Sequence, residues 1–315
     1  MTSHNYSPGS SLGNNTYSPY RLYLITATLI SIIDLILFFK NKWHISSAGI
    51  FSNAFYIILI TAPLLLKRYN QNSRIKNALA CCALLIIFCL CATVLGYFVI
   101  STNEPNIDQW LAAADYLMGF DWPNIIIWAQ SKPIFSLILL LAYSSVLLQI
   151  VIVIIYLSFT DRVRQLTEFN DVFIITGLVT IIASGFFPVA GPGKYYHDLV
   201  HVDLSRISQL EPLRDGTLRT IDLSNLQGLV SMPSFHTIMA ILLIYAMRRT
   251  KVQWIFLILN IVVLVATPIC GEHYLADMIG GVITVVLVIA SWNFVASMRD
   301  RASPLTRTES PAETL

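Results

Sequence analysis

Long uninterrupted apolar segments constrain this chain more than any other feature of its sequence. A bilayer has a hydrocarbon core about 30 Å thick, which about 20 helical residues can cross. Eight candidate runs are present, at residues 21–39, 49–66, 78–100, 133–158, 171–190, 233–247, 252–270 and 274–296. Because the runs are continuous rather than alternating, and open sheet edges cannot be satisfied in lipid, we expect helices. The predicted fold class is all-α, a polytopic transmembrane helical bundle of about eight spans.

The composition agrees with a membrane protein and argues against several other classes. Of 315 residues, 56% are hydrophobic and only 12% are charged, against about 25% charged in ordinary soluble chains. The net charge is +2 with no basic block, so we expect no nucleic-acid partner. The five cysteines lie in apolar runs without a C-x-x-C pair, which disfavours a disulfide framework and a zinc site. No acidic cluster suited to Mg²⁺ is present, and we expect neither a metal nor a cofactor.

The distribution of basic residues predicts the orientation in the membrane. Lys and Arg accumulate in cytoplasmic loops, and most of the 20 in this chain fall on one side if both termini are cytoplasmic. The outer side then carries two long loops, at residues 101–132 and 191–232. In the first loop, apolar residues from Ile107 to Met118 recur at helical spacing, while Asp108 and Asp115 share the opposite face. This pattern predicts a short helix that lies flat on the outer surface.

The first chemically informative segment runs from Met232 to Thr237 and opens an apolar run. Pro233 suits the first turn of a helix, because its missing N–H would be unpaired there in any case. Ser234 and His236 then lie where free backbone amides point out of the helix end. Such an end binds anions, phosphate above all, so the segment is a candidate phosphate-binding site.

The second segment runs from Gly271 to Asp277 and, on the predicted topology, lies on the same outer side. His273 and Asp277 are four residues apart, which places them on one face of a helix. The carboxylate can accept from one ring nitrogen of the histidine and leave the other as a nucleophilic lone pair. A lone histidine at a membrane surface is usually structural, but two at one depth, each with a helper residue, favour an active site.

These two segments resemble the second and third signature motifs of the type 2 phosphatidic acid phosphatase superfamily. The resemblance includes their order, the 37-residue separation of His236 and His273, and the helical hairpin between them. It is closest to the lipid phosphotransferase branch, which includes inositol phosphorylceramide synthases and sphingomyelin synthases. Residues 119–123 and 213–219 resemble segments of bacterial members of that branch. The resemblance covers roughly residues 78–297.

The resemblance implies a mechanism and a domain organisation. His273 would attack phosphorus and form a phosphohistidine, Asp277 would orient it, and His236 would protonate the departing alkoxide. A catalytic domain at 78–297, comprising the last six spans, would follow a polar N-terminal tail (1–20) and two accessory helices (21–77), and would precede a disordered C-terminal tail (298–315). The function implied is a lipid-phosphate hydrolase or phosphotransferase at the outer face of the membrane, which we expect to be a bacterial inner membrane. The substrate would be a phospholipid or another lipid phosphate.

The sequence also departs from the family pattern. The first motif, a lysine and an Arg-Pro six residues apart, is not found, and Thr267 replaces the arginine common before the third-motif histidine. Another cation must then hold the phosphate. The outer-loop candidates are Lys194, Arg206, Arg214 and Arg219, of which we favour Arg214 and Arg219, whose loop leads into the Pro-Ser-Phe-His helix, with Lys194 third.

Several alternatives remain open at this stage. Hydrolysis and transfer of the headgroup to an alcohol use the same residues, so an inositol phosphorylceramide synthase-like transferase is the main alternative to a phosphatase. If His236 only binds phosphate, the acid could be Lys194, His197 or His201. A haem-binding membrane protein would also use two histidines, but it needs no acid at i+4. A lipid transporter would explain the bundle, although the spans lack paired broken helices and several mid-membrane charges. The sequence does not indicate the oligomeric state.

Overall fold

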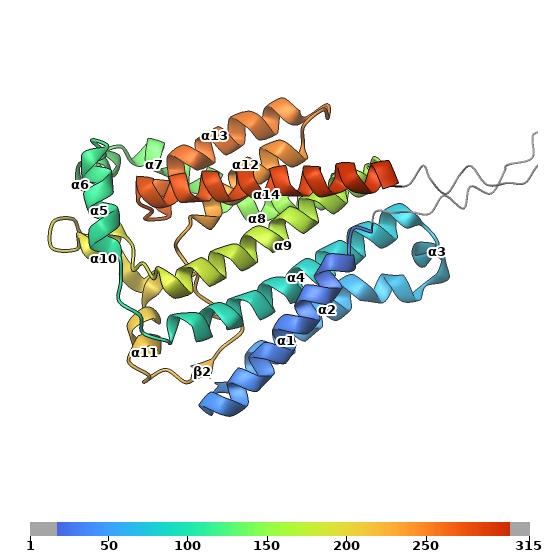
Figure 1. The fold of residues 1–315 in the computed structure, drawn as a ribbon, viewed down its shortest axis with the longest axis horizontal. Coiled ribbons are helices and arrows are strands. Elements are labelled where there is room, and N and C mark those ends of the chain that lie inside the picture. Colours follow the sequence, from blue (N-terminus) through green and yellow to red (C-terminus); the bar gives the residue numbers. More distant parts are fainter. Residues whose placement is uncertain (1–17, 303–315) are drawn as a thin grey trace, which may run out of the picture.

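The computed structural model describes residues 18–302, and within that range the chain is 74% helical with almost no strand (Figure 1). The predicted N-terminal tail (1–20) and C-terminal tail (298–315) lie largely outside the described residues. The last helix nevertheless continues to Ala302, and therefore extends into the segment expected to be disordered. The all-α prediction is confirmed, and the two strands are only two residues long each.

The N-terminal helices lie against one side of the bundle. They are α1 (Arg21–Asn41), α2 (Ser47–Thr61) with the 3₁₀ helix η1 (Ala62–Leu65), and α3 (Lys67–Asn70). Helices α1 and α2 both pack on α4 (Ser73–Ile100). The strand β1 (His44–Ile45), which follows α1, pairs in parallel with β2 (Thr220–Ile221). This pairing fixes the end of α1 to the loop that leads into the candidate site.

The remaining apolar helices form the body of the bundle. These are α7 (Pro133–Ser144), α8 (Val146–Phe159), α9 (Val163–Phe186), α12 (Phe235–Ala246), α13 (Gln253–Cys270) and α14 (Leu275–Ala302). Helix α12 packs against α9, α13 and α14, and α7 packs along α13. The largest apolar core lies where α4, α8, α9 and α12 meet, around Phe88, Val153, Leu166 and Leu243, all nearly inaccessible. Because lipid is as apolar as these side chains, close packing between the helices, rather than removal from water, holds this core together.

Each predicted apolar run contains a helix, but the runs differ in length. Within residues 18–302, five helices are long and apolar enough to cross a membrane, or up to six if α6 (Trp122–Gln130) and α7 count as one bent span. The segments at 49–65, 146–159 and 235–246 are shorter apolar helices. The predicted run 133–158 is interrupted at Ser145, and α6 and α7 meet at 111° just before Pro133, where the ring of proline disfavours a continuing helix.

Short elements of the two long loops gather at one end of the bundle, at the left of Figure 1. They are α5 (Asp108–Leu117), α6, α10 (Pro192–Tyr195), the 3₁₀ helix η2 (Leu204–Ile207) and α11 (Leu210–Arg214). The predicted helix at 107–118 is present as α5, but its orientation differs from that of an amphipathic surface helix. Asp108 and Asp115 are buried against the protein, whereas Trp110 is 69% exposed. The acids face inward because backbone N–H groups of two other segments bind them.

Candidate active site

Helix α12 begins with a side-chain cap at Ser234. The Ser234 hydroxyl accepts from the Thr237 N–H at 3.4 Å and from the Thr237 hydroxyl at 3.1 Å, and the Ser234 side chain is fully buried. Pro233 therefore precedes the cap, whereas the sequence had suggested a place in the first helical turn. The cap satisfies one of the free N–H groups of the helix start. Ser234 thus has a structural role here, and its direct contact with phosphate stays a prediction.

The start of α14 holds the second histidine. His273 Nδ1 lies 3.1 Å from Asp277 Oδ2, and the same oxygen accepts from the Tyr274 N–H at 3.3 Å. His273 lies just before the helix, so Asp277 reaches back from the first turn to cap it, as an acid at this position commonly does. Both side chains are buried, His273 at 6% and Asp277 at 1% exposure. A carboxylate only accepts, so Nδ1 carries the proton and Nε2 has the free lone pair.

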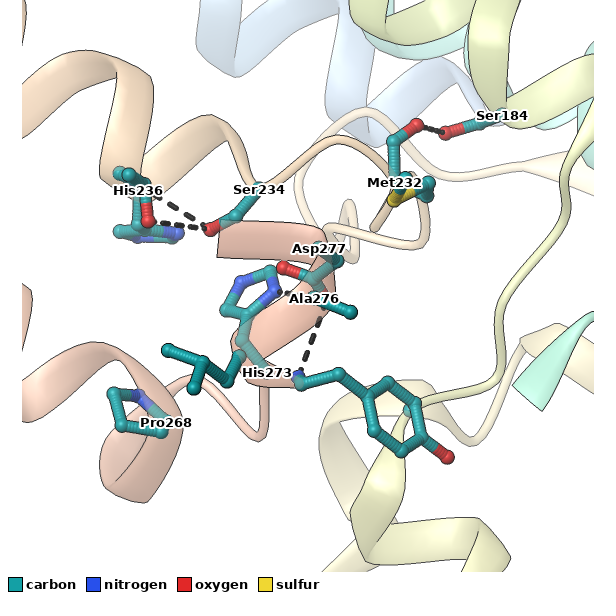
Figure 2. A network of polar contacts seen from close by, with 12 residues as sticks. Ser184, Met232, Ser234, His236, Pro268, His273, Ala276 and Asp277 are labelled. Atoms are coloured by element: carbon teal, nitrogen blue, oxygen red, sulfur yellow. Dashed lines mark hydrogen bonds and ion pairs between the residues drawn. The ribbon is translucent and has the colours of Figure 1, made fainter. Parts of the chain in front are cut away.

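The two helix starts are joined directly to each other. The Ser234 N–H donates to the Asp277 carbonyl at 3.2 Å. Gly281 on α14 permits this approach, because a Cβ there would lie 2.7 Å from the Ser234 carbonyl oxygen. As a result the rings of His236 and His273 face a common space, with their centroids 6.1 Å apart and the ring planes inclined at 56° (Figure 2).

His236 is oriented by a tyrosine that the sequence did not single out. The Tyr143 hydroxyl, at the end of α7, lies 3.0 Å from His236 Nδ1, and the two rings stack at 4.2 Å. This contact leaves His236 Nε2 for a reacting group. Gly271 makes room for Tyr143, since a Cβ at Gly271 would lie 2.6 Å from the tyrosine hydroxyl and 2.9 Å from His273 Cδ2.

Two acids of α5 bind the residues that directly follow His273. Asp115 accepts from the Leu275 and Ala276 N–H groups at 2.9 and 2.8 Å, and so caps the start of α14. Asp108 accepts from the Tyr274 hydroxyl at 3.1 Å and from the Gly191 N–H at 2.9 Å. Burial raises the pKa of Asp115, while its two N–H donors act in the opposite direction. The sequence showed that these acids share a face but not what they bind.

The three cations favoured from the sequence have partners other than the histidine pair. Lys194 forms an ion pair with Glu211, and an Arg214 Nη donates to the Glu104 carbonyl at 2.7 Å. The Arg219 guanidinium lies 5.3 Å from the centroid of the Trp43 ring. Their predicted role in binding phosphate stays a prediction.

Arg206 of η2 is the loop cation tied to the histidine segment. Its Nη1 donates at 2.9 Å to the carbonyl of Cys270, the last residue of α13 and three residues before His273. Burial raises the pKa of the Glu272 carboxyl, and the nearby Arg206 lowers it in part. The guanidinium therefore lies close to the segment that carries His273. The sequence offered Arg206 only as one of four candidates.

Two cavities adjoin this region and differ in chemistry. One, of about 350 Å³, has a polar side formed by His201, Asp203, Arg206 and Glu272. The other, of about 180 Å³, lies between α4 and α9 and is almost wholly apolar; it reaches Phe235, the residue between Ser234 and His236. Within residues 18–302, no group of three or more His, Cys, Asp and Glu side chains is placed to hold a metal ion.

Comparison with known proteins places these residues in a family. No curated protein sequence and no solved structure matches the chain significantly. The sequence model of the PAP2 superfamily, however, matches residues 109–291, more than half of the chain, and that range includes both histidines and Asp277. The chain therefore belongs to the PAP2 superfamily, whose members are phosphatases or phosphotransferases.

Proposed function

We propose that the protein is a lipid-phosphate hydrolase or phosphotransferase that works through a phosphohistidine at His273. The observation that carries the proposal is the buried His273–Asp277 pair, with its hydrogen bond of 3.1 Å. Fixing the Nδ1 proton leaves Nε2 as the nucleophile. The second histidine, 6.1 Å away between ring centroids, can serve as acid and base on the opposite side of a phosphoryl group.

The reaction proceeds in two displacements at phosphorus. In the first, the lone pair of His273 Nε2 forms a bond to phosphorus while the P–O bond to the lipid alcohol or headgroup breaks. His236 starts as the imidazolium and gives its Nε2 proton to the departing oxygen, while Nδ1 keeps its proton, which it donates to the Tyr143 hydroxyl. In the second, water or an acceptor alcohol loses a proton to His236 and attacks phosphorus, and the P–N bond to His273 breaks. Both steps need positive charge around the equatorial phosphoryl oxygens.

We assign that charge first to Arg206. Its hydrogen bond to the Cys270 carbonyl fixes the guanidinium beside the His273 segment, and a guanidinium suits two phosphoryl oxygens at once. Free backbone N–H groups at the start of α12 add a partial positive charge. Arg214, Arg219 and Lys194 are the alternatives carried over from the sequence.

The apolar cavity supports a lipid as the substrate. Gly177 of α9 borders it, and the Thr180 hydroxyl, in a side chain only 2% exposed, has no hydrogen-bond partner among the described residues. An acyl chain there would bury apolar surface next to α12, while the polar cavity beside Glu272 would take the headgroup. Transfer of the phosphoryl group to an alcohol is the alternative to hydrolysis.

In our proposal the site lies at the outer face of the membrane, with both termini cytoplasmic.

The decisive experiment follows the phosphate and the lipid separately. Purified protein is incubated with phosphatidic acid or phosphatidylinositol, with and without a ceramide or diacylglycerol acceptor. Free phosphate from phosphatidic acid, or inositol phosphate from phosphatidylinositol, indicates hydrolysis, and a new phospholipid indicates transfer. His273→Ala should abolish both products, whereas His44→Ala, in the exposed strand β1, should abolish neither. Full activity of His273→Ala would refute the proposal.

The predicted side of the membrane is tested by thiol labelling. In a variant without native cysteines, Ser208→Cys should react with an impermeant reagent in intact cells, whereas Lys251→Cys should not. Both positions are exposed, and they lie at opposite ends of the bundle. The reverse labelling pattern would place the site in the cytoplasm.

A further inference from the structure

A large cleft at the bundle surface lies away from the histidines, between α1, α9 and α14. Its volume is about 660 Å³, larger than either cavity beside the candidate active site. Helices α1 and α14 form the two sides and α9 forms the floor, with Thr167, Asp171 and Ile175. Helix α1 packs on α4 and α9, so the space between α1 and α14 is left for another molecule.

Chain direction places one end of this cleft opposite the candidate active site. Helix α14 starts beside His273 and carries Arg299 in its last turn. Helix α1 starts at Arg21 and ends near β1, which pairs with β2 in the loop before α12. Arg21 and Arg299 therefore both lie at the end of the bundle opposite the candidate active site.

The lining of the cleft is basic at that end and apolar along its length. Arg21 and Arg299 are exposed, and neither forms an ion pair with a lining residue of the cleft. The one acid in the lining, Asp171, accepts from Trp292 Nε1 at 3.1 Å. The apolar wall includes Ile25 and Leu287, which are 47% and 61% exposed. No described part of the chain covers this wall.

We propose that the cleft binds an anionic phospholipid, with its phosphate between Arg21 and Arg299 and an acyl chain along α1 and α14. Guanidinium groups bind phosphate through charge-assisted hydrogen bonds, and anionic lipids concentrate near basic residues at a membrane surface. The acyl chain of the lipid would also cover the apolar wall of the cleft. The cleft shares no lining residue with either cavity beside the candidate active site, so it is a separate site that does not depend on the mechanism proposed for the histidines.

Such a lipid would join the accessory helix α1 to α14, which carries Asp277. It would therefore stabilise the packing of the N-terminal helices without touching the reacting groups. The lining carries two arginines and one acid, Asp171, which also attracts Arg299, so its net charge of +1 favours an anionic headgroup. A zwitterionic lipid would bring its own positive charge close to the arginines and should therefore bind more weakly.

The test compares lipids and variants of the full-length protein. Purified protein in detergent is given phosphatidylglycerol or phosphatidylcholine, and retained lipid is counted by native mass spectrometry alongside the melting temperature. Wild type should retain phosphatidylglycerol at least about tenfold better, and Arg21→Gln/Arg299→Gln should lose that preference. The matched control Arg68→Gln/Lys251→Gln removes two exposed charges outside the cleft and should keep it. Glycerol 3-phosphate, which has a phosphate group but no acyl chain, should neither stabilise the protein nor compete with phosphatidylglycerol.

Three outcomes would overturn the proposal. Equal retention of the two lipids by wild type would show no selective site. Unchanged preference in the double variant would place the lipid elsewhere. A preference that appears only after removal of residues 303–315 would mean that the protein's own C-terminal segment fills the cleft. A further variant, Leu287→Trp, narrows the apolar wall without changing charge and should weaken phosphatidylglycerol retention while leaving turnover intact.

Discussion

The junction of α12 and α14 and the loop at 191–232 both approach the candidate active site, but they are held in different ways. At the junction, His273, Asp277 and Ser234 are buried and bound to one another or to helix ends. In the loop, Lys194 and Arg214 are fixed by a surface acid and a backbone carbonyl. Groups held by buried contacts within and between helix ends keep one geometry, whereas exposed ion pairs are weak and easily exchanged. The junction is therefore suited to bond making, and the loop to substrate binding.

The largest loss of turnover is expected from substitutions of His273 and Asp277 at the junction. His273→Ala removes the lone pair that a buried carboxylate fixes in place, so turnover should fall at least about 10⁴-fold. Asp277→Asn keeps the shape but removes the charge that fixes the tautomer, and should cost about 10²–10⁴-fold. Phosphate release by purified variants measures both. Near-normal turnover by either variant, in protein that elutes like wild type, would count against the mechanism.

The next prediction distinguishes the role of His236 from that of His273. His236→Ala should slow reaction of an alkyl phosphate about 10²–10⁴-fold, because a poor leaving group needs a proton. The aryloxide of an aryl phosphate departs without a proton, so the rate with this substrate should fall clearly less. Phosphate on His273 should then accumulate, because discharge needs the same base. Equal losses on both substrates, with no trapped intermediate, would make His236 a phosphate-binding residue and return Lys194, His197 and His201 as candidate acids.

The sequence could predict contacts between residues that lie close together in the chain, but not contacts between distant residues. The His273–Asp277 pair follows from a spacing of four residues, so it was visible in the sequence. The sequence located the start of α12 only approximately, because it placed Pro233 in the first turn, whereas Ser234 caps the helix. Each predicted apolar run likewise contained a helix, because hydrophobicity alone decides its location. Tyr143 on His236, Asp115 on Ala276 and Arg206 on Cys270 join residues far apart in the chain. No local periodicity records such contacts, and neither does it record the inward orientation of α5.

The loop is tested by comparing its cations. Arg206→Gln should lower kcat/KM about 10- to 100-fold by weakening phosphate binding, with folding unchanged. Arg214→Gln and Arg219→Gln remove the same charge from residues whose contacts lie elsewhere, and should each cost less than about threefold. Steady-state kinetics on one lipid phosphate provide the comparison. A larger loss for Arg214 or Arg219 than for Arg206 would restore the assignment favoured by the sequence.

The smallest effect concerns Glu272, which connects the loop to the junction. Burial raises the pKa of its carboxyl above the usual value of 4.5, and Arg206 offsets only part of that rise. The folded protein therefore binds the proton more tightly than the unfolded chain, so this carboxyl lowers stability as the pH rises through 4.5 and past the folded pKa.

The substitution Glu272→Gln mimics the neutral form at every pH. Its free energy of unfolding should match that of wild type near about pH 4 and exceed it near about pH 7, by less than about 1 kcal/mol because the carboxyl is partly exposed. Thermal unfolding of the two proteins at both pH values measures the difference. In an Arg206→Gln background the advantage of Glu272→Gln should grow, since the compensating charge is gone. If Glu272→Gln instead destabilises the protein at neutral pH, the carboxylate is the favoured form, and the loop and the junction are joined by an ion pair rather than by a buried acid.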